Sequence, residues 1–207
     1  MIDQIKHIFA QITLTEWLAV ITAFFCVWLT VKNRIENWYW AIPSVILYTI
    51  VFRDQHLYAS AALNLFYFLP CCVYGYWVWK RCGPKQDDDL SVTTLTKQIF
   101  VRWLVVSVLI SLLLSWFIDH FIATKDPHLY ADSFTAGFSI VAQYLQARKV
   151  FENWWIWIGV DVVYATYLLP SQGLFLSMVL YIAFTLLAIR GAIEWKPLIG
   201  KPKVVPQ

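Results

Sequence analysis

Residues 152–164 read Glu-Asn-Trp-Trp-Ile-Trp-Ile-Gly-Val-Asp-Val-Val-Tyr, and the first three of them repeat residues 36–38. The Glu-Asn-Trp motif therefore occurs twice, 116 residues apart. The same spacing, kept without gaps, aligns Glu16 with Asp132 and Tyr48 with Tyr164. It also aligns residues 79–80 with residues 195–196, and both pairs read Trp-Lys. The sequence thus predicts two copies of one structural unit.

Seven apolar segments surround these motifs, at roughly 16–34, 37–53, 57–79, 98–122, 131–148, 153–169 and 173–195. Each is close to the ~20 residues that cross a hydrocarbon core as a helix. The 207-residue chain is 60% hydrophobic and only 14% charged, whereas soluble domains carry roughly 25% charged residues. A soluble fold of this composition would expose large apolar patches. We therefore predict an all-α integral membrane protein with seven transmembrane helices.

The repeat divides this predicted membrane domain. The offset pairs segments one to three with segments five to seven and leaves the fourth as a connection, a 3+1+3 arrangement. Both halves begin on the same side of the membrane, so the repeats are parallel, which is a transporter pattern with the binding site between the halves. The predicted single domain, 1–207, comprises a first three-helix repeat (16–80), a linker helix (98–122), a second repeat (131–196) and a cytoplasmic tail (197–207). A surface helix is predicted before the first repeat, over residues 2–12.

Basic residues predict the orientation. With seven crossings, 13 of the 16 Lys and Arg residues fall on one side, and only Lys6, Arg53 and Lys125 fall on the other. Positive residues are retained on the cytoplasmic side of a membrane. The N-terminus is therefore predicted to lie outside the cell and the C-terminus in the cytoplasm.

A candidate binding face lies in the segment 153–169. Trp154, Trp157, Asp161 and Tyr164 share one side of a helix, and Asp161 lies near mid-membrane. A carboxylate there costs roughly 2.5–3.5 kcal/mol unless it faces a cavity or a partner. Either a protonated Asp161 bonds to a neighbouring helix, or it meets a cationic or hydroxyl-rich ligand. Trp157 is predicted to stack on that ligand, whereas Trp154 could instead belong to the interfacial aromatic belt.

Further polar residues are predicted to line the same cavity. Ser139, Gln143 and Gln146 form a stripe in the fifth segment. Hydrogen bonds between helices could explain Ser and Thr there, but two glutamines one turn apart favour a cavity wall. The offset places Val27, Thr30 and Val45 opposite Gln143, Gln146 and Asp161, so the repeated fold does not require these polar groups, and ligand binding is favoured. The opposite wall is predicted to contain Asn64, Tyr67, Trp40, Ser44 and Tyr48.

The sequence also excludes several functions. It contains no G-x-x-x-x-G-K-[ST], H-E-x-x-H or G-x-S-x-G motif, so we expect no ATP use and no enzyme of those classes. Its four cysteines lack metal-ligand spacing, and no cofactor or metal is expected. The alternative from another class is a small intramembrane enzyme or receptor. An enzyme would need a second group facing Asp161, and Asp119 lies at the wrong depth.

The stretch 143–164, Gln-x-x-Gln-Ala-Arg-Lys-Val-Phe-Glu-Asn-Trp-Trp-Ile-Trp through Tyr164, resembles the PnuC family of bacterial vitamin transporters, and so does 62–79. The W-x-x-W pair of that family matches Trp154 and Trp157. The resemblance implies a fold like a full-length SWEET transporter, often a homotrimer, in the bacterial inner membrane. It also implies facilitated diffusion of the NAD precursor nicotinamide riboside, which a cytoplasmic kinase then traps by phosphorylation. Close relatives carry thiamine or riboflavin, so these stay open as alternatives. Nicotinamide riboside and thiamine are aromatic cations and suit Trp157 and Asp161, whereas uncharged riboflavin suits Asp161 less well.

Overall fold

The computed structural model describes residues 13–54, 58–81, 91–122, 129–171 and 175–200, and the predicted surface helix over 2–12 lies outside them. Within the described residues, each of the seven predicted segments is helical. The first two are α2 (Leu14–Val31) and α3 (Asn37–Asp54); the third comprises α4 (Tyr58–Leu63), η1 (Asn64–Phe68) and α5 (Leu69–Arg81). The fourth and fifth are α6 (Lys97–Ile122) and α7 (Leu129–Ala147); the sixth comprises α8 (Asn153–Val163), η2 (Tyr164–Leu168) and α9 (Leu169–Ser171). The seventh is α10 (Phe175–Trp195), which a short 3-10 turn, η3 (Lys196–Leu198), follows.

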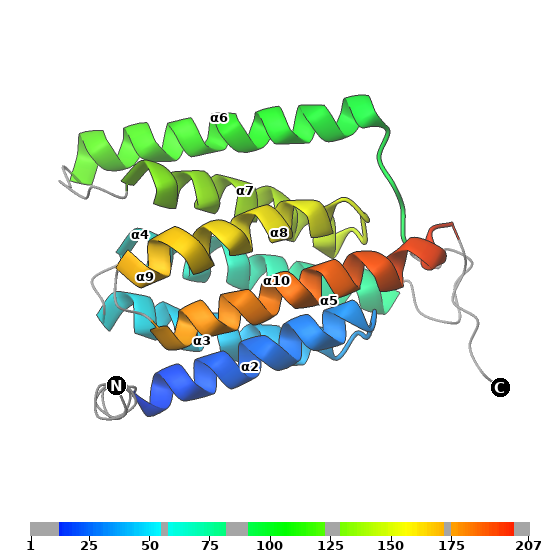
Figure 1. Cartoon of the computed structure of the whole chain (residues 1–207), viewed down its shortest axis with the longest axis horizontal. Coiled ribbons are helices and arrows are strands. Elements are labelled where there is room, and N and C mark those ends of the chain that lie inside the picture. The colour runs from blue at the N-terminus through cyan, green and yellow to red at the C-terminus, as the bar shows by residue number, and fades with distance from the viewer. Residues whose placement is uncertain (1–12, 55–57, 82–90, 123–128, 172–174, 201–207) are drawn as a thin grey trace.

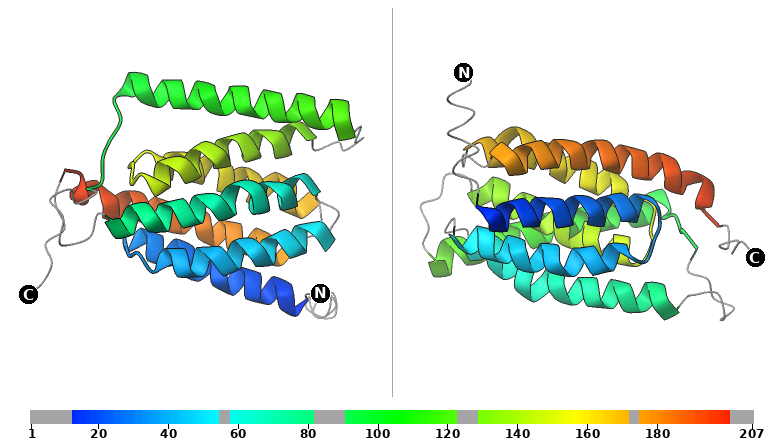
Figure 2. Two further views of the ribbon diagram at one scale, coloured as in Figure 1. Left: turned by 180° about the vertical axis from the view of Figure 1, so that it is seen from behind. Right: turned by 90° about the horizontal axis from the view of Figure 1, so that it is seen from below.

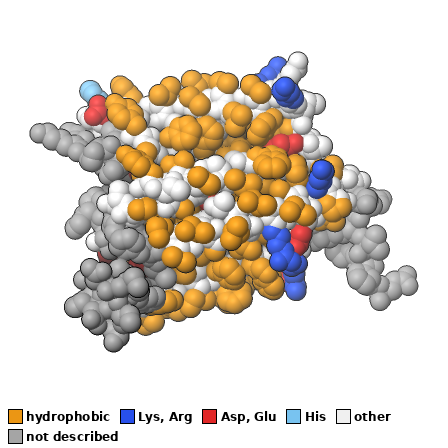
Figure 3. All heavy atoms as spheres, viewed as in Figure 1, with side chains coloured by type: hydrophobic (Ala, Val, Ile, Leu, Met, Phe, Trp, Pro, Cys, Tyr) orange, Lys and Arg blue, Asp and Glu red, His pale blue; other side chains and the backbone are white. Residues whose placement is uncertain are grey.

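The face of the bundle that Figure 3 shows is apolar along its length. Four described helical stretches are long and apolar enough to cross a membrane, namely Leu14–Val31, Ala61–Lys80, Lys97–Phe121 and Ser177–Leu198. Lys and Arg gather at one end of the molecule, where the α2–α3 and α7–α8 connections lie and where α10 ends (Figures 1 and 3). We call this the basic end. An apolar belt with charges at its ends is the surface that a bilayer-spanning bundle requires.

Helix α6 lies along one edge of the bundle (Figures 1 and 2) and packs against α7. Small residues permit the close approach: Ser107, Ser111 and Ser115 are buried, and a Cβ on Gly137 would collide with Ser111. Ser111 donates its hydroxyl to Ser107 O at 2.8 Å and to Phe134 O at 3.3 Å. Small-residue packing of this kind joins helices in lipid, where the hydrophobic effect supplies no attraction between them.

The two connections at the basic end adopt the same backbone conformation, 116 residues apart. Asn33 and Lys149 are the described non-glycine residues with positive φ, and φ is 52° at both. Asn33 N donates to Thr30 O, and Lys149 N donates to Gln146 O, at 2.9 and 3.0 Å. The repeated Glu-Asn-Trp motif therefore marks the same left-handed turn followed by a helix in each half.

The asparagines of this motif do not cap their helices, contrary to what a helix-opening Asn usually does. Both are fully buried first residues of a helix, and their amide groups donate backwards. Asn37 Nδ2 donates to Thr30 Oγ1 at 2.9 Å, and Asn153 Nδ2 donates to Val150 O at 2.6 Å. Each asparagine thus fastens the helix start to the turn before it.

The described residues just before α6 form hydrogen bonds with the basic end of the second half. Thr93 N donates to Lys149 O, and Phe151 N donates to Thr93 O, at 3.1 and 2.8 Å. The buried carboxylate of Glu152 accepts from Thr94 Oγ1 at 2.6 Å and from Leu95 N at 3.0 Å. The equivalent carboxylate in the first half, Glu36, instead pairs with Arg34 at the surface. The two halves thus share a fold, but the equivalent glutamates at the basic end make different interactions.

Candidate substrate-binding site

A cavity of about 180 Å³ lies inside the bundle. Its walls come from every described helical segment except α6, α9 and η3. Nine positions line the cavity in both halves, related by the 116-residue offset. The equivalent lining pairs are Ala23 and Ser139, Val27 and Gln143, Thr30 and Gln146, Trp38 and Trp154, Ala41 and Trp157, Val45 and Asp161, Tyr48 and Tyr164, Phe68 and Phe184, and Cys72 and Ala188. The cavity is therefore the space enclosed between two similar walls.

The two walls differ in chemistry. Where the first half has Val27, Ala41 and Val45, the second half has Gln143, Trp157 and Asp161. At these three positions, polar or aromatic groups able to orient a ligand face the cavity from α7 and α8 only. A pocket that is largely apolar and contains a few convergent polar groups is the usual form of a small-molecule site.

Two hydrogen bonds fix the side chains of the polar wall. Trp157 Nε1 donates to Gln146 Oε1 at 2.8 Å. Gln143 Nε2 lies 3.8 Å from Cys72 Sγ, a contact that reaches across to α5 in the first half. The first bond leaves the amide nitrogen of Gln146 as a donor and holds the Trp157 ring in one orientation. A ring held in place offers a preformed stacking surface.

Asp161 is 4% exposed and lines the cavity. The ion pairs that the structure describes join other residues, so none of them neutralises Asp161. No Lys, Arg or His occurs among the described lining residues. The carboxylate therefore lies where a ligand in the cavity could reach it.

Ten of the twelve predicted site residues line the cavity. They are Trp154, Trp157, Asp161, Tyr164, Gln143, Gln146, Ser139, Asn64, Ser44 and Tyr48. The other two lie elsewhere. Tyr67 donates its hydroxyl to Ile140 O at 2.7 Å, and Trp40 is 38% exposed at the surface, 4.9 Å from the Phe25 ring.

Several lining residues escaped the sequence prediction. The most prominent are aromatic: Trp38, Phe52, Phe68, Tyr181 and Phe184. A signal for one of them was present, because the offset carries the predicted residue Trp154 to Trp38. Applying the offset to each predicted site residue would have found much of the facing wall.

Comparison with known proteins settles the family. A family model described as nicotinamide mononucleotide transporter matches residues 13–197. The chain belongs to this family. Its members are membrane transporters, so this protein is an integral membrane transporter and not an enzyme. The resemblance to PnuC that the sequence predicted is confirmed.

Individual relatives support this family assignment. The chain is 27% identical over 202 residues to the nicotinamide riboside transporter PnuC of Escherichia coli (strain K12), covering 87% of this chain and 84% of that protein. It is 29% identical over 201 residues to a Neisseria mucosa protein of the same name, covering 90% and 74% respectively. Its fold matches the crystal structure of the vitamin B3 transporter PnuC with a TM-score of 0.76, at 24% identity, over 90% of this chain and 82% of that one.

Proposed function

We propose that this protein carries nicotinamide riboside into the cell by facilitated diffusion. The observation that carries the proposal is that Trp157 and Asp161 both line the cavity. The described lining contains no Lys, Arg or His. The substrate joins a flat pyridinium cation to a ribose. An indole face and a carboxylate both attract such a cation, while Gln143 and Gln146 offer hydrogen-bonding groups to the ribose hydroxyls.

The cavity favours the riboside over its phosphorylated form. A phosphate monoester carries a charge of about −1.5 to −2 at neutral pH. Inside this cavity it would lose its hydration, find no basic side chain among the described lining residues, and lie near Asp161. The same repulsion explains how a cytoplasmic kinase would trap the vitamin, because the phosphorylated product could not return through the cavity.

Thiamine is the second candidate, because it is also an aromatic cation and satisfies the same two side chains. Riboflavin is uncharged and gives Asp161 no counter-charge. Calorimetric titration of the purified protein with nicotinamide riboside, its mononucleotide, thiamine and riboflavin tests the assignment. We expect the riboside to bind most tightly. Equal affinity for the mononucleotide, or tight binding of thiamine with none of the riboside, would reject it.

We further propose a 3+1+3 architecture like that of a full-length SWEET transporter, in one membrane domain over 1–207. Residues 16–80 and 131–196 form parallel three-helix repeats, 98–122 form the linker helix and 197–207 the cytoplasmic tail. The equivalent lining pairs and the shared turns at Asn33 and Lys149 support this division. So does the position of α6, which packs on α7 at the edge of the bundle.

We also propose that the protein spans the bacterial inner membrane with its N-terminus outside and its basic end in the cytoplasm. A homotrimer is the assembly we expect. The apolar outer surface of α6 supports contact with lipid or a neighbouring subunit, since Leu109, Leu112 and Leu113 are each about three-fifths exposed. Cytoplasmic reporter activity from a C-terminal fusion tests the orientation, and mass measurement in detergent tests the trimer.

A further inference from the structure

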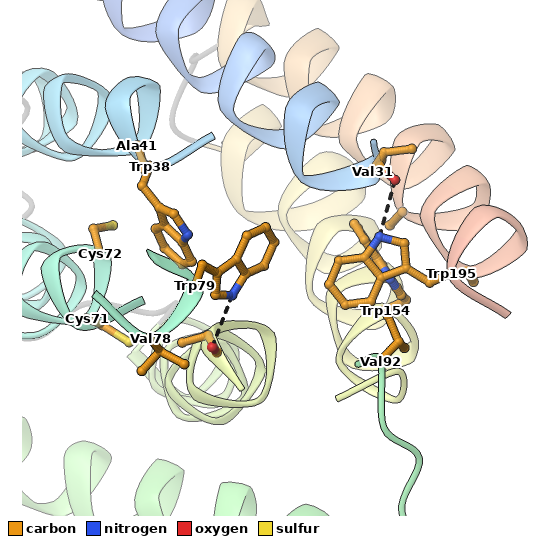
Figure 4. Packing of buried hydrophobic residues seen from close by; sticks show 13 residues of the cluster. Val31, Trp38, Ala41, Cys71, Cys72, Val78, Trp79, Val92, Trp154 and Trp195 are labelled. Atoms are coloured by element: carbon orange, nitrogen blue, oxygen red, sulfur yellow. Dashed lines mark hydrogen bonds between the residues drawn. The ribbon is translucent and has the colours of Figure 1, made fainter. Parts of the chain in front are cut away.

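Four tryptophans form a buried layer at the basic end of the bundle (Figure 4). They are Trp38 at the start of α3, Trp79 near the end of α5, Trp154 at the start of α8 and Trp195 at the end of α10, and none is more than 5% exposed. Neighbouring rings touch, with centroid separations of 5.5 Å (Trp38–Trp79), 6.3 Å (Trp79–Trp195) and 5.2 Å (Trp154–Trp195). Trp38 and Trp154 line the cavity and lie where α3 and α8 begin, so the layer forms part of the cavity wall next to the basic end.

Hydrogen bonds from this layer cross between the two halves. Trp79 Nε1, in the first half, donates to Ala147 O in the second half at 3.1 Å. Trp195 Nε1, in the second half, donates to Thr30 O and to Val31 O in the first half, at 3.1 and 3.2 Å. The donors are 116 residues apart, and so are the acceptors Val31 and Ala147. Each half therefore gives one indole N–H to the other and accepts one in return.

Two glycines allow the layer to close without a gap. A Cβ on Gly75 would collide with the Trp38 ring, and a Cβ on Gly191 would collide with the Trp154 ring. These glycines are also 116 residues apart. The Lys149 ammonium lies 4.4 Å from the centre of the Trp79 ring. This cation–π contact favours the closed layer.

We propose that this layer is the gate at the basic end of the transport path, and that the two crossed hydrogen bonds are its latch. Bonds within one half would survive a movement of the halves as rigid bodies. The crossed bonds cannot, because donor and acceptor belong to different halves. Separation of the halves at this end breaks both together, so the gate opens in one step. The proposal rests on passage of substrate through the cavity, as the proposed function requires.

The test measures access to the cavity and uses no vitamin, so it is independent of the substrate assignment. Cys26 and Cys72 line the cavity and are free thiols. Inside-out and right-side-out vesicles are treated with a membrane-impermeant cationic methanethiosulfonate, and modification of each cysteine is followed by mass spectrometry. One neutral hydrogen bond contributes about 1 kcal/mol, a factor of about five. Trp79→Phe should therefore speed labelling from the basic end about fivefold, and Trp79→Phe with Trp195→Phe about thirtyfold.

Trp77→Phe is the matched control, because Trp77 lies on the same helix as Trp79 and is 47% exposed. Its labelling rate should equal that of the unchanged protein. The gate is disproved if the Trp79 and Trp195 variants, shown to be folded by their elution as a single species, label no faster than this control.

A second experiment avoids the buried tryptophans altogether. Lys32 and Glu194 form an exposed ion pair of 3.1 Å between the two halves at the basic end. We expect a reducible cross-link between Lys32→Cys and Glu194→Cys to hold the gate shut, which should abolish labelling of Cys72 from the basic end until reductant is added. Undiminished labelling in the cross-linked protein would overturn the proposal even if the tryptophan variants do not fold.

Discussion

Trp157 donates its indole N–H to Oε1 of Gln146, at 2.8 Å, and both side chains line the cavity. The bond joins α8 to α7 within the polar wall and fixes the face that the indole ring presents. Substrate recognition should therefore depend on Trp157 directly and on Gln146 partly through it.

Replacing Trp157 with Ala should weaken binding of nicotinamide riboside by tens of fold. A cation–π contact in a desolvated site contributes about 2 kcal/mol. Titration of the purified variant measures the loss. Trp155→Ala is the matched control, because its ring is 54% exposed on the outside of the same helix. Equal losses from the two substitutions would show that the binding face is assigned wrongly.

Gln146→Ala should weaken binding less, by roughly fivefold, because one hydrogen bond of about 1 kcal/mol orients the ring. Because Gln146 acts partly through Trp157, the double variant should lose less binding free energy than the sum of the two single losses. A double-mutant cycle measures this coupling. Fully additive losses would mean that Gln146 contacts the substrate independently and does not position the ring.

Asp161→Asn should reduce binding of a cationic substrate by at least about tenfold while leaving the fold intact. The change keeps the shape and hydrogen-bonding groups of the side chain but removes a charge whose attraction is on the order of a few kcal/mol. Thermal stability should stay the same or rise, because a costly buried charge is lost. Normal binding by Asp161→Asn, combined with failure of Asp161→Leu to fold, would instead identify a structural hydrogen-bonding residue.

Transport should need no ion gradient. Asp161 is the one carboxylate among the described residues that line the cavity, and a proton relay would need a second such group. Liposomes that contain only this protein should bring labelled nicotinamide riboside to equal concentrations inside and outside. Accumulation above the outside concentration, driven by a proton or sodium gradient, would contradict passive transport.

The sequence by itself determined the class of protein and its segments. Hydropathy over about 20 residues is a local property, so it located all seven helical segments without knowledge of their packing. The spacing of Glu36-Asn37-Trp38 and Glu152-Asn153-Trp154 predicted the equivalence that the turns at Asn33 and Lys149 display. Helical periodicity placed Trp157 and Asp161 on one face, because α8 is regular there.

Only the tertiary structure decided which faces meet. Asn64 and Tyr67 share a face in a regular helix, but the π-helical turn over Asn64–Phe68 rotates the following residues, and Tyr67 bonds to α7 instead of lining the cavity. Trp40 lies at the edge of its helix face, where contact with Phe25 holds it outside. The crossed bonds of Trp79 and Trp195 join residues 68 and 164 positions apart. No local pattern encodes such bonds, because a donor's partner is fixed only when the two halves pack together.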